Sequence, residues 1–154
     1  MLKIKRLLFL PVLLAIVACS STDDEQDENP DSFDRGAVLK NWADNIIIPS
    51  FENFETATQD LAGKTLEFIE DPTEAKFAVL RSAYEEGYIQ FQTVSMFEIG
   101  KAEAVNFRPN LNTYPVDEVT VEEKISAGEF NLELPSSFDE QGFPALDYLL
   151  YGLG

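Results

Sequence analysis

The sequence predicts an all-α protein built around a pair of long antiparallel helices. Apolar residues recur at steps of three and four over two long segments, from about residue 38 to 69 and from about 77 to 95. Between them lies the sequence Asp-Pro-Thr-Glu at 71–74, which is typical of a helix start. Two amphipathic helices joined by so short a turn form an antiparallel hairpin, which is half of a helical bundle.

The first long helix contains one proline near its beginning. Pro49 has no amide hydrogen to donate to the Asn45 carbonyl, and its ring crowds that carbonyl. We therefore expect a kink near residues 45 to 49 or two consecutive helices. The apolar stripe of this segment consists of Val38, Leu39, Trp42, Ile46, Phe51, Phe54, Ala57, Leu61, Phe68 and Ile69.

The second long helix is predicted to begin directly after Glu70. Asp71 is the expected N-cap, Pro72 suits the first helical position, and Glu74 completes a capping box. The stripe of this helix consists of Phe77, Leu80, Tyr84, Tyr88, Phe91 and Val94. The aromatic set of Tyr84, Tyr88, Phe91 and Phe97 is interpreted as core rather than as a surface on which a cofactor stacks.

Irregular structure is expected after Gly100. We predict a short helical segment within 102–107, a loop through RPNLNTYPVDE, and a helix at about 121–127 with a Thr120–Glu123 capping box and Gly128 as terminator. FNLELPSSFDEQ is read as another loop.

A last helix is predicted to open at Pro144. Its apolar face is expected to consist of Leu146, Leu149, Leu150 and Leu153. Because so short a helix is marginal on its own, we expect it either to dock into the hairpin groove or to continue into a longer protein.

The N-terminus has the pattern of an export signal. Lys3, Lys5 and Arg6 precede an apolar stretch at 7–17, so residues 1–18 are predicted to be a signal peptide too short to span a bilayer permanently. Ile-Val-Ala-Cys at 16–19 resembles the bacterial lipobox, which makes Cys19 the predicted lipidation site and membrane anchor. An ordinary secreted protein, with its one cysteine at the cleavage point by chance, is the alternative.

The chain that follows residue 18 is strongly acidic. It holds eight basic and 28 acidic residues, a formal charge of −20, which excludes nucleic-acid binding and disfavours basic contacts with anionic lipid. Residues 19–34 are predicted to form a disordered acidic tether, and residues 35–154 the folded domain. An acidic cluster after a lipidated cysteine also resembles a surface-export signal, so periplasmic and surface-facing orientations are both open.

Four segments, in order, carry a family resemblance. LKNWADNIIIPSFENFETATQDL, LRSAYEEGYIQFQTVSMFEIGKAEAVNFR, LNTYPVD and GFPALDYLLYG resemble successive blocks of imelysin-like proteins, the peptidase M75 family, from about Val38 to Gly152. The resemblance implies one half of an all-helical fold of two bundles, with the C-terminal half missing from this chain. It also implies an outer-membrane lipoprotein of the cell envelope, iron as the associated metal, and outer-membrane iron-transport components as partners.

The family's functional signature is G-x-H-x-x-E, which maps here onto Gly142, Pro144 and Asp147. A His and a Glu three residues apart share one helix face, where they can bind a metal or exchange a proton. Proline offers neither donor nor acceptor, and the chain contains no histidine. A serine–histidine or cysteine–histidine pair, an HExxH zinc site and an imidazole haem ligand are therefore excluded within these residues, and peptidase activity through the family motif is not expected.

Two further charged residues are candidate ligands or buried charges. Glu98 lies between Phe97 and Ile99, where an acid requires a partner. Arg81, on the second long helix, is a candidate partner for Asp147 or Glu98, and its alternative interpretation is an exposed surface charge.

Three hypotheses for function follow. The first is a non-catalytic binding lipoprotein linked to iron or haem acquisition. The second is an M75-type metallopeptidase with a degenerate motif, in which Asp147 and Glu98 act with groups outside this chain. The third is a structural or interaction lipoprotein, or a truncated product.

Overall fold

The computed structural model describes residues 33–152, and within that range every element is a helix, which confirms the predicted fold class. The predicted signal peptide, Cys19, the predicted tether up to residue 32, and Leu153 lie outside the described residues. No helix in the described part of the chain combines the length and apolarity that crossing a bilayer requires.

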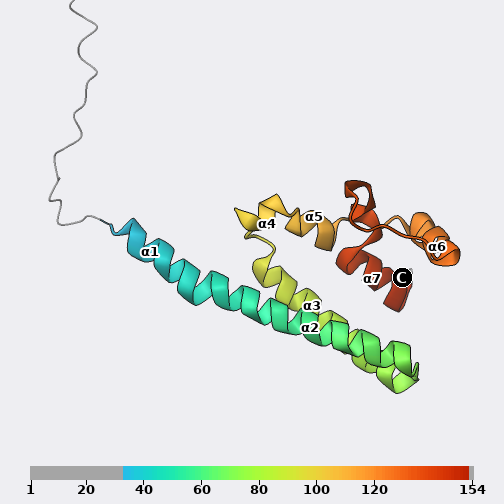
Figure 1. Cartoon of the computed structure of the whole chain (residues 1–154). Coiled ribbons are helices and arrows are strands. Elements are labelled where there is room, and N and C mark those ends of the chain that lie inside the picture. Colours follow the sequence, from blue (N-terminus) through green and yellow to red (C-terminus); the bar gives the residue numbers. More distant parts are fainter. Residues whose placement is uncertain (1–32, 153–154) are drawn as a thin grey trace, which may run out of the picture. The chain divides into compact units, whose positions relative to one another are not determined.

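The predicted hairpin is confirmed. Helices α2 (Ile48–Glu70) and α3 (Glu74–Val94) run antiparallel and pack along their length (Figure 1). Their buried residues follow steps of three and four, as an amphipathic helix requires: Phe54, Ala57 and Leu61 on α2, and Leu80, Ala83, Tyr84, Gly87, Phe91 and Val94 on α3. Near the hairpin turn, the rings of Phe68 and Phe77 lie 5.2 Å apart.

The first helix is disturbed where Pro49 predicts, but it does not separate into two helices. Helix α1 (Arg35–Trp42) passes through a π-helical turn, η1 (Ala43–Ile47), directly into α2. The Ile48 amide donates to the Ala43 carbonyl, five residues back, instead of four as in an α-helix. The backbone hydrogen bonds directly before Pro49 therefore follow the wider π pattern, in the turn where proline removes an α-helical bond.

The predicted cap of the second helix is wrong by two residues. Thr73 is the N-cap of α3, and its hydroxyl accepts a bond from the Lys76 amide at 3.3 Å. The N-cap must have an extended backbone, which Thr73 adopts, whereas Pro72 comes before the helix. The Asp71 carboxylate instead pairs with Lys76, at 3.0 Å.

Five short helical elements form a second layer over the hairpin: α4 (Lys101–Ala104), α5 (Phe107–Asn112), α6 (Glu118–Ala127), the 3-10 helix η2 (Pro135–Glu140) and α7 (Gly142–Tyr151) (Figure 1). The predicted helical stretch at 102–107 is divided between α4 and α5. The loop predicted to follow it is instead helical over 108–112. Pro109 permits this because it is the third residue of α5, a position whose amide hydrogen has no partner within the helix.

Helix α6 begins earlier than predicted but ends where expected. Its N-cap is Asp117, which accepts from the Thr120 amide at 3.0 Å, so Thr120 is inside the helix and not its cap. Gly128 ends it in the left-handed conformation (φ 69°) and donates to the Lys124 carbonyl at 2.9 Å.

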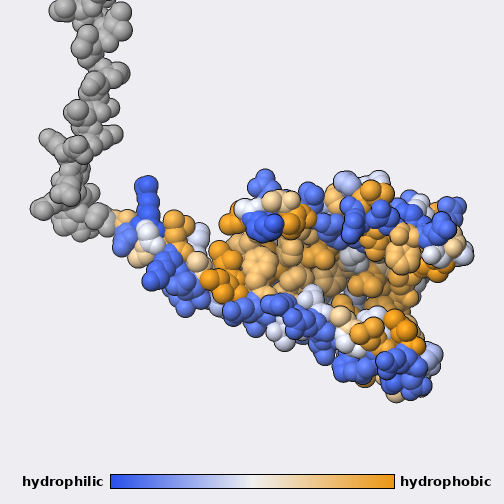
Figure 2. Space-filling view, in the orientation of Figure 1, coloured by the Kyte–Doolittle hydropathy of each residue, from blue (hydrophilic) through white to orange (hydrophobic). Residues whose placement is uncertain are grey.

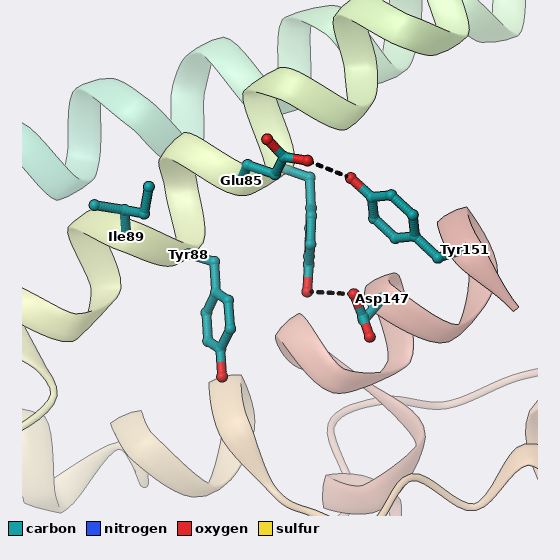
Figure 3. Close-up of a pocket in the computed structure, with 6 residues that line it drawn as sticks. Glu85, Tyr88, Ile89, Asp147 and Tyr151 are labelled. Atoms are coloured by element: carbon teal, nitrogen blue, oxygen red, sulfur yellow. Dashed lines mark hydrogen bonds between the residues drawn. The ribbon is translucent and has the colours of Figure 1, made fainter. Parts of the chain in front are cut away.

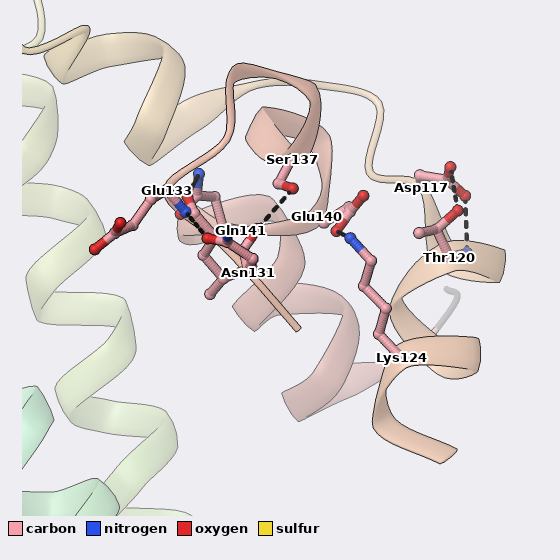
Figure 4. Close-up of polar contacts among 9 residues, drawn as sticks. Asp117, Thr120, Lys124, Asn131, Glu133, Ser137, Glu140 and Gln141 are labelled. Atoms are coloured by element: carbon pink, nitrogen blue, oxygen red, sulfur yellow. Dashed lines mark hydrogen bonds and ion pairs between the residues drawn. The ribbon is translucent and has the colours of Figure 1, made fainter. Parts of the chain in front are cut away.

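The predicted loop before α7 is instead partly a 3-10 helix held by polar contacts (Figure 4). Lys124 of α6 forms an ion pair with Glu140 of η2. The Asp117 amide donates to the Asp139 carbonyl at 2.8 Å, and the Ser137 hydroxyl donates to the Asn131 carbonyl at 3.0 Å. These contacts tie η2 to α6, to its N-cap and to the loop that follows it, immediately before α7 begins.

Helix α7 packs against the hairpin, which is the first of the two arrangements that the sequence predicts for it. Phe143 is buried, and its ring centroid lies 5.3 Å from that of Phe91 and 6.4 Å from that of Phe54. The predicted apolar face was wrong in part, since Leu150 is buried but Leu146 and Leu149 are exposed. Phe143 and Leu150, seven residues apart, define the docking face, which was not visible from the leucine pattern alone.

Candidate functional site

Gly142 of the mapped motif has a backbone role. Its φ is +77°, a left-handed conformation that glycine adopts at little cost. A Cβ at this position would lie 2.4 Å from the Leu111 carbonyl oxygen and 2.8 Å from that of Asn110. Only glycine therefore allows α7 to start against the end of α5.

Pro144 and Asp147 lie on the first two turns of α7, where Asp147 meets α3. Helix α7 begins at Gly142 rather than at Pro144, which is the third residue, a position that needs no amide hydrogen. The Tyr84 hydroxyl donates to the Phe143 carbonyl at 3.1 Å and lies 3.3 Å from Asp147 Oδ1 (Figure 3). Asp147 is otherwise exposed to solvent.

The buried phenol of Tyr84 is held in its neutral form. Burial raises its pKa well above the ordinary value for tyrosine, and the neighbouring Asp147 carboxylate raises it further. The hydroxyl therefore acts as a hydrogen-bond donor at neutral pH.

Two more tyrosine–carboxylate pairs surround this contact. The Tyr151 hydroxyl donates to Glu85 Oε1 at 2.9 Å, and the Tyr148 hydroxyl donates to Glu122 (Figure 3 shows the first pair). Burial, followed by the bond with Glu85, raises the pKa of Tyr151. The bond with Glu122 is the main cause that raises the pKa of Tyr148.

Asp147 lines two pockets, which share Tyr84, Tyr88 and Asp147 as walls. Their volumes are ≈ 380 and ≈ 390 Å³, within the range of small-molecule sites. The first is lined by Tyr84, Glu85, Tyr88, Ile89, Asp147 and Tyr151. The second is lined by Tyr84, Tyr88, Asn112, Tyr114, Val116, Glu118, Pro144, Asp147, Tyr148 and Gly152. Tyr88, predicted as core, is 37% exposed, whereas Tyr84 and Phe91 are buried as predicted, although Tyr84 also lines both pockets.

Arg81 holds the end of α7 and pairs with neither predicted carboxylate. Its Nε and Nη2 donate to the Leu150 carbonyl at 3.0 and 2.5 Å. Its guanidinium carbon lies 4.2 Å from the ring centroid of Phe77 and 4.7 Å from that of Tyr151. A cation at the C-terminus of a helix stabilises it through the helix dipole, so Arg81 fastens α7 to α3.

Glu98 has a partner, as its apolar neighbours suggest, and the partner is Arg108. Glu98 Oε2 accepts from Arg108 Nε at 2.8 Å, and Oε1 accepts from the Arg108 amide at 3.2 Å. The bond with Arg108 lowers the pKa of Glu98. Glu98 and Asp147, predicted to act together in the peptidase hypothesis, thus take separate partners.

The donor set does not fit a resident metal centre. Within residues 33–152, no group of three or more His, Cys, Asp or Glu side chains is placed to hold a metal ion. Sequence reasoning missed Tyr84, Tyr148, Tyr151 and Glu85 as site residues. The available signal was the need of a buried tyrosine hydroxyl for a partner.

The Tyr84 contact makes stability sensitive to alkaline pH. Because folding raises the pKa of Tyr84, the group stabilises the fold fully below its ordinary pKa of about 10, and this contribution is lost as pH rises through the folded value. Urea unfolding from about pH 8 to 11 should show a decline in the free energy of unfolding that is shallower in Tyr84→Phe. Tyr114→Phe, at an exposed position, is the control. Equal declines in Tyr84→Phe and the unsubstituted chain would contradict this assignment.

Comparison with known proteins agrees with the fold. The family model described as Peptidase_M75, imelysin, matches residues 47–154. The chain is also similar in structure to a crystal structure of an imelysin peptidase from Bacteroides ovatus, with a TM-score of 0.67 and 17% sequence identity. That match covers 74% of this chain and 35% of the other, so the chain spans about a third of that protein's length. No curated protein matches the chain significantly. The chain belongs to the imelysin family.

Proposed function

We propose that the chain is an exported, lipid-anchored binding protein that serves iron acquisition and does not act as a peptidase. One observation carries the proposal. At the place of the family motif, an accessible Asp147 lies in tyrosine-lined pockets, with Pro144 where the imidazole belongs. The pockets provide a binding surface, while the group that would do acid–base or metal chemistry is replaced.

The chemistry of the motif residues supports a non-catalytic role. A proline side chain can neither ligate a metal nor carry a proton, and the chain has no histidine to replace it. The Tyr84 phenol is neutral and engaged with Asp147 and the Phe143 carbonyl.

Iron fits this site as cargo that brings its own ligands. A complexed iron, such as haem or ferric citrate, needs from the protein only a few oxygen donors and an apolar or aromatic wall. Carboxylate and phenol oxygens suit hard metal ions, and tyrosine also ligates haem iron. Asp147, Tyr148 and Tyr88 line one pocket and offer both kinds of surface.

The location of the protein is part of the proposal. The lipobox-like Ile16–Cys19 supports attachment to the outer membrane through acyl chains on Cys19. Outer-membrane iron-transport components are the corresponding partners, and the acidic segment after Cys19 is compatible with a periplasmic or a surface-facing orientation.

Calorimetry with the purified chain tests this function. Ferrous iron, ferric citrate and haem are titrated separately, and we expect saturable binding of at least one. Asp147→Asn keeps the shape of the side chain but removes its charge, and should weaken binding by about tenfold, the effect of losing one charge-assisted contact. Asp60→Asn, at an exposed position on α2, is the matched control and should bind normally.

Two results would contradict the proposal. Absence of binding for all three ligands would end the iron-linked role. Cleavage of unfolded casein by the purified chain, lost in Asp147→Asn and kept in Asp60→Asn, would instead favour the peptidase hypothesis.

A further inference from the structure

A third hollow, separate from the Asp147 pockets, lies between the start of α2 and the segment from the end of α3 to α5. Its volume is ≈ 370 Å³. Figure 2 shows hydrophobic side chains gathered between the beginning of α2 and α4. The lining residues are Ile47, Phe51, Phe97, Ile99, Lys101, Ala102, Val105 and Phe107, and none of them lines an Asp147 pocket. We call this hollow the α4 groove.

The α4 groove has one charged lining residue, Lys101. Among the described residues, the ion pairs involve Lys64, Lys76, Arg108 and Lys124, but not Lys101. Its ammonium is therefore available at a groove whose other walls are aliphatic or aromatic.

Nearby negative charge does not cancel Lys101. Glu98 lies between the lining residues Phe97 and Ile99, but its carboxylate is engaged by Arg108. Glu103 is exposed and follows Lys101 by two residues on α4, a spacing at which helical side chains do not face each other. The one charged side chain that lines the groove is thus a cation, although the whole chain has a formal charge of −17.

The Glu98–Arg108 pair also explains why an acid stands within the apolar run MFEIG. The pair joins the segment after α3 to the first turn of α5, because Arg108 directly follows the lining residue Phe107. It braces the side of the groove that faces the start of α2, and it engages the Glu98 carboxylate.

An apolar groove with a single ammonium suits a ligand with an apolar tail and one anionic head group. A second copy of this chain fits poorly, because two strongly acidic molecules repel each other. We propose that the α4 groove binds the hydrocarbon tail of a fatty acid, whose carboxylate is held by Lys101. Burial of the tail provides the affinity, and Lys101 selects the head group.

The probe is radiolabelled decanoate, measured by equilibrium dialysis against the full chain without detergent. Every sample carries Cys19→Ser, so that no attached acyl chain competes. We expect saturable binding of one decanoate per chain, and weaker binding of decyltrimethylammonium, which has the same tail and the opposite charge. Lys101→Gln should weaken decanoate binding by about two- to fivefold, the worth of one exposed ion pair. Lys64→Gln, on α2, is the control and should change nothing.

A second pair of variants tests the apolar wall. Ile99 and Ile69 are almost equally exposed, at 66% and 67%, but only Ile99 lines the groove. Ile99→Asp should abolish decanoate binding by placing a carboxylate against the tail, whereas Ile69→Asp should leave it unchanged. Because both side chains are exposed, both variants should keep the helical circular dichroism of the unsubstituted chain.

Three outcomes would overturn the proposal. They are no saturable decanoate binding, equal loss in Ile99→Asp and Ile69→Asp, and equal affinity for decanoate and decyltrimethylammonium. Asp147→Asn should bind decanoate normally, so failure of the iron-linked function and failure of this inference are separate results.

Discussion

Replacing Phe143 with alanine is expected to lower the free energy of unfolding by about 3 to 5 kcal/mol, the range for removing a buried aromatic side chain. Phe143 is 3% exposed, and its ring contacts those of Phe54, Tyr84, Tyr88 and Phe91. The variant loses the side chain through which α7 packs on the hairpin. Denaturant unfolding followed by circular dichroism measures the effect.

Leu149→Ala, on the same helix, is the matched control for Phe143→Ala. Leu149 is 50% exposed, so its truncation should change the free energy of unfolding by no more than about 1 kcal/mol. Equal effects of the two substitutions would mean that α7 does not dock through Phe143.

Replacing Gly142 with alanine should cost about 2 to 5 kcal/mol of unfolding free energy, through two causes that add. A residue with a Cβ is destabilised by about 1 to 2 kcal/mol in the left-handed conformation. Crowding of a packed site adds a destabilisation of about 1 to 3 kcal/mol. The atoms in the way belong to the backbone of α5, at 2.4 to 2.8 Å, and so cannot turn aside like a flexible side chain. The same unfolding experiment measures this variant.

Gly63→Ala provides the opposite control within the same protein. Gly63 lies inside α2, and nothing lies within 4 Å of a Cβ added there. Alanine should therefore stabilise the helix, by about 0.5 to 1 kcal/mol. A Gly142→Ala variant as stable as the unsubstituted chain would refute the backbone role assigned to Gly142.

The two long helices could be predicted from the sequence because the spacing of apolar residues along a single segment determines them. The three- and four-residue spacing from Phe54 to Leu61 and from Leu80 to Val94 predicts both buried stripes. The caps were displaced by two or three residues, because Asp71, Thr73, Asp117 and Thr120 are all good N-cap types. Which of two nearby candidates caps a helix depends on backbone angles, which the residue types alone do not specify.

The candidate site was predictable in its position but not in its contacts. Gly142, Pro144 and Asp147 were found from the motif, yet Asp147 meets Tyr84 across 63 residues and Arg81 meets Leu150 across 69. Such contacts depend on how α7 docks on α3. That docking is directed by Phe143, which the leucine-based prediction of the helix face left out.

The π turn before Pro49 changes which way the start of the molecule faces. Each residue of an α-helix turns the chain by about 100°, so the one extra residue of a π turn rotates everything before it by about that angle. The apolar stripe has a five-residue step at this point, from Ile46 to Phe51, and the i to i−5 bond of the π turn matches that step. Helix α1 extends beyond the end of α3 (Figure 1), so Trp42, the chain's one tryptophan, is 53% exposed, and no residue of α1 is buried. A single-residue deletion within 43–47 would break this five-residue match and rotate the side chains of α1 by about 100° relative to the apolar stripe of α2.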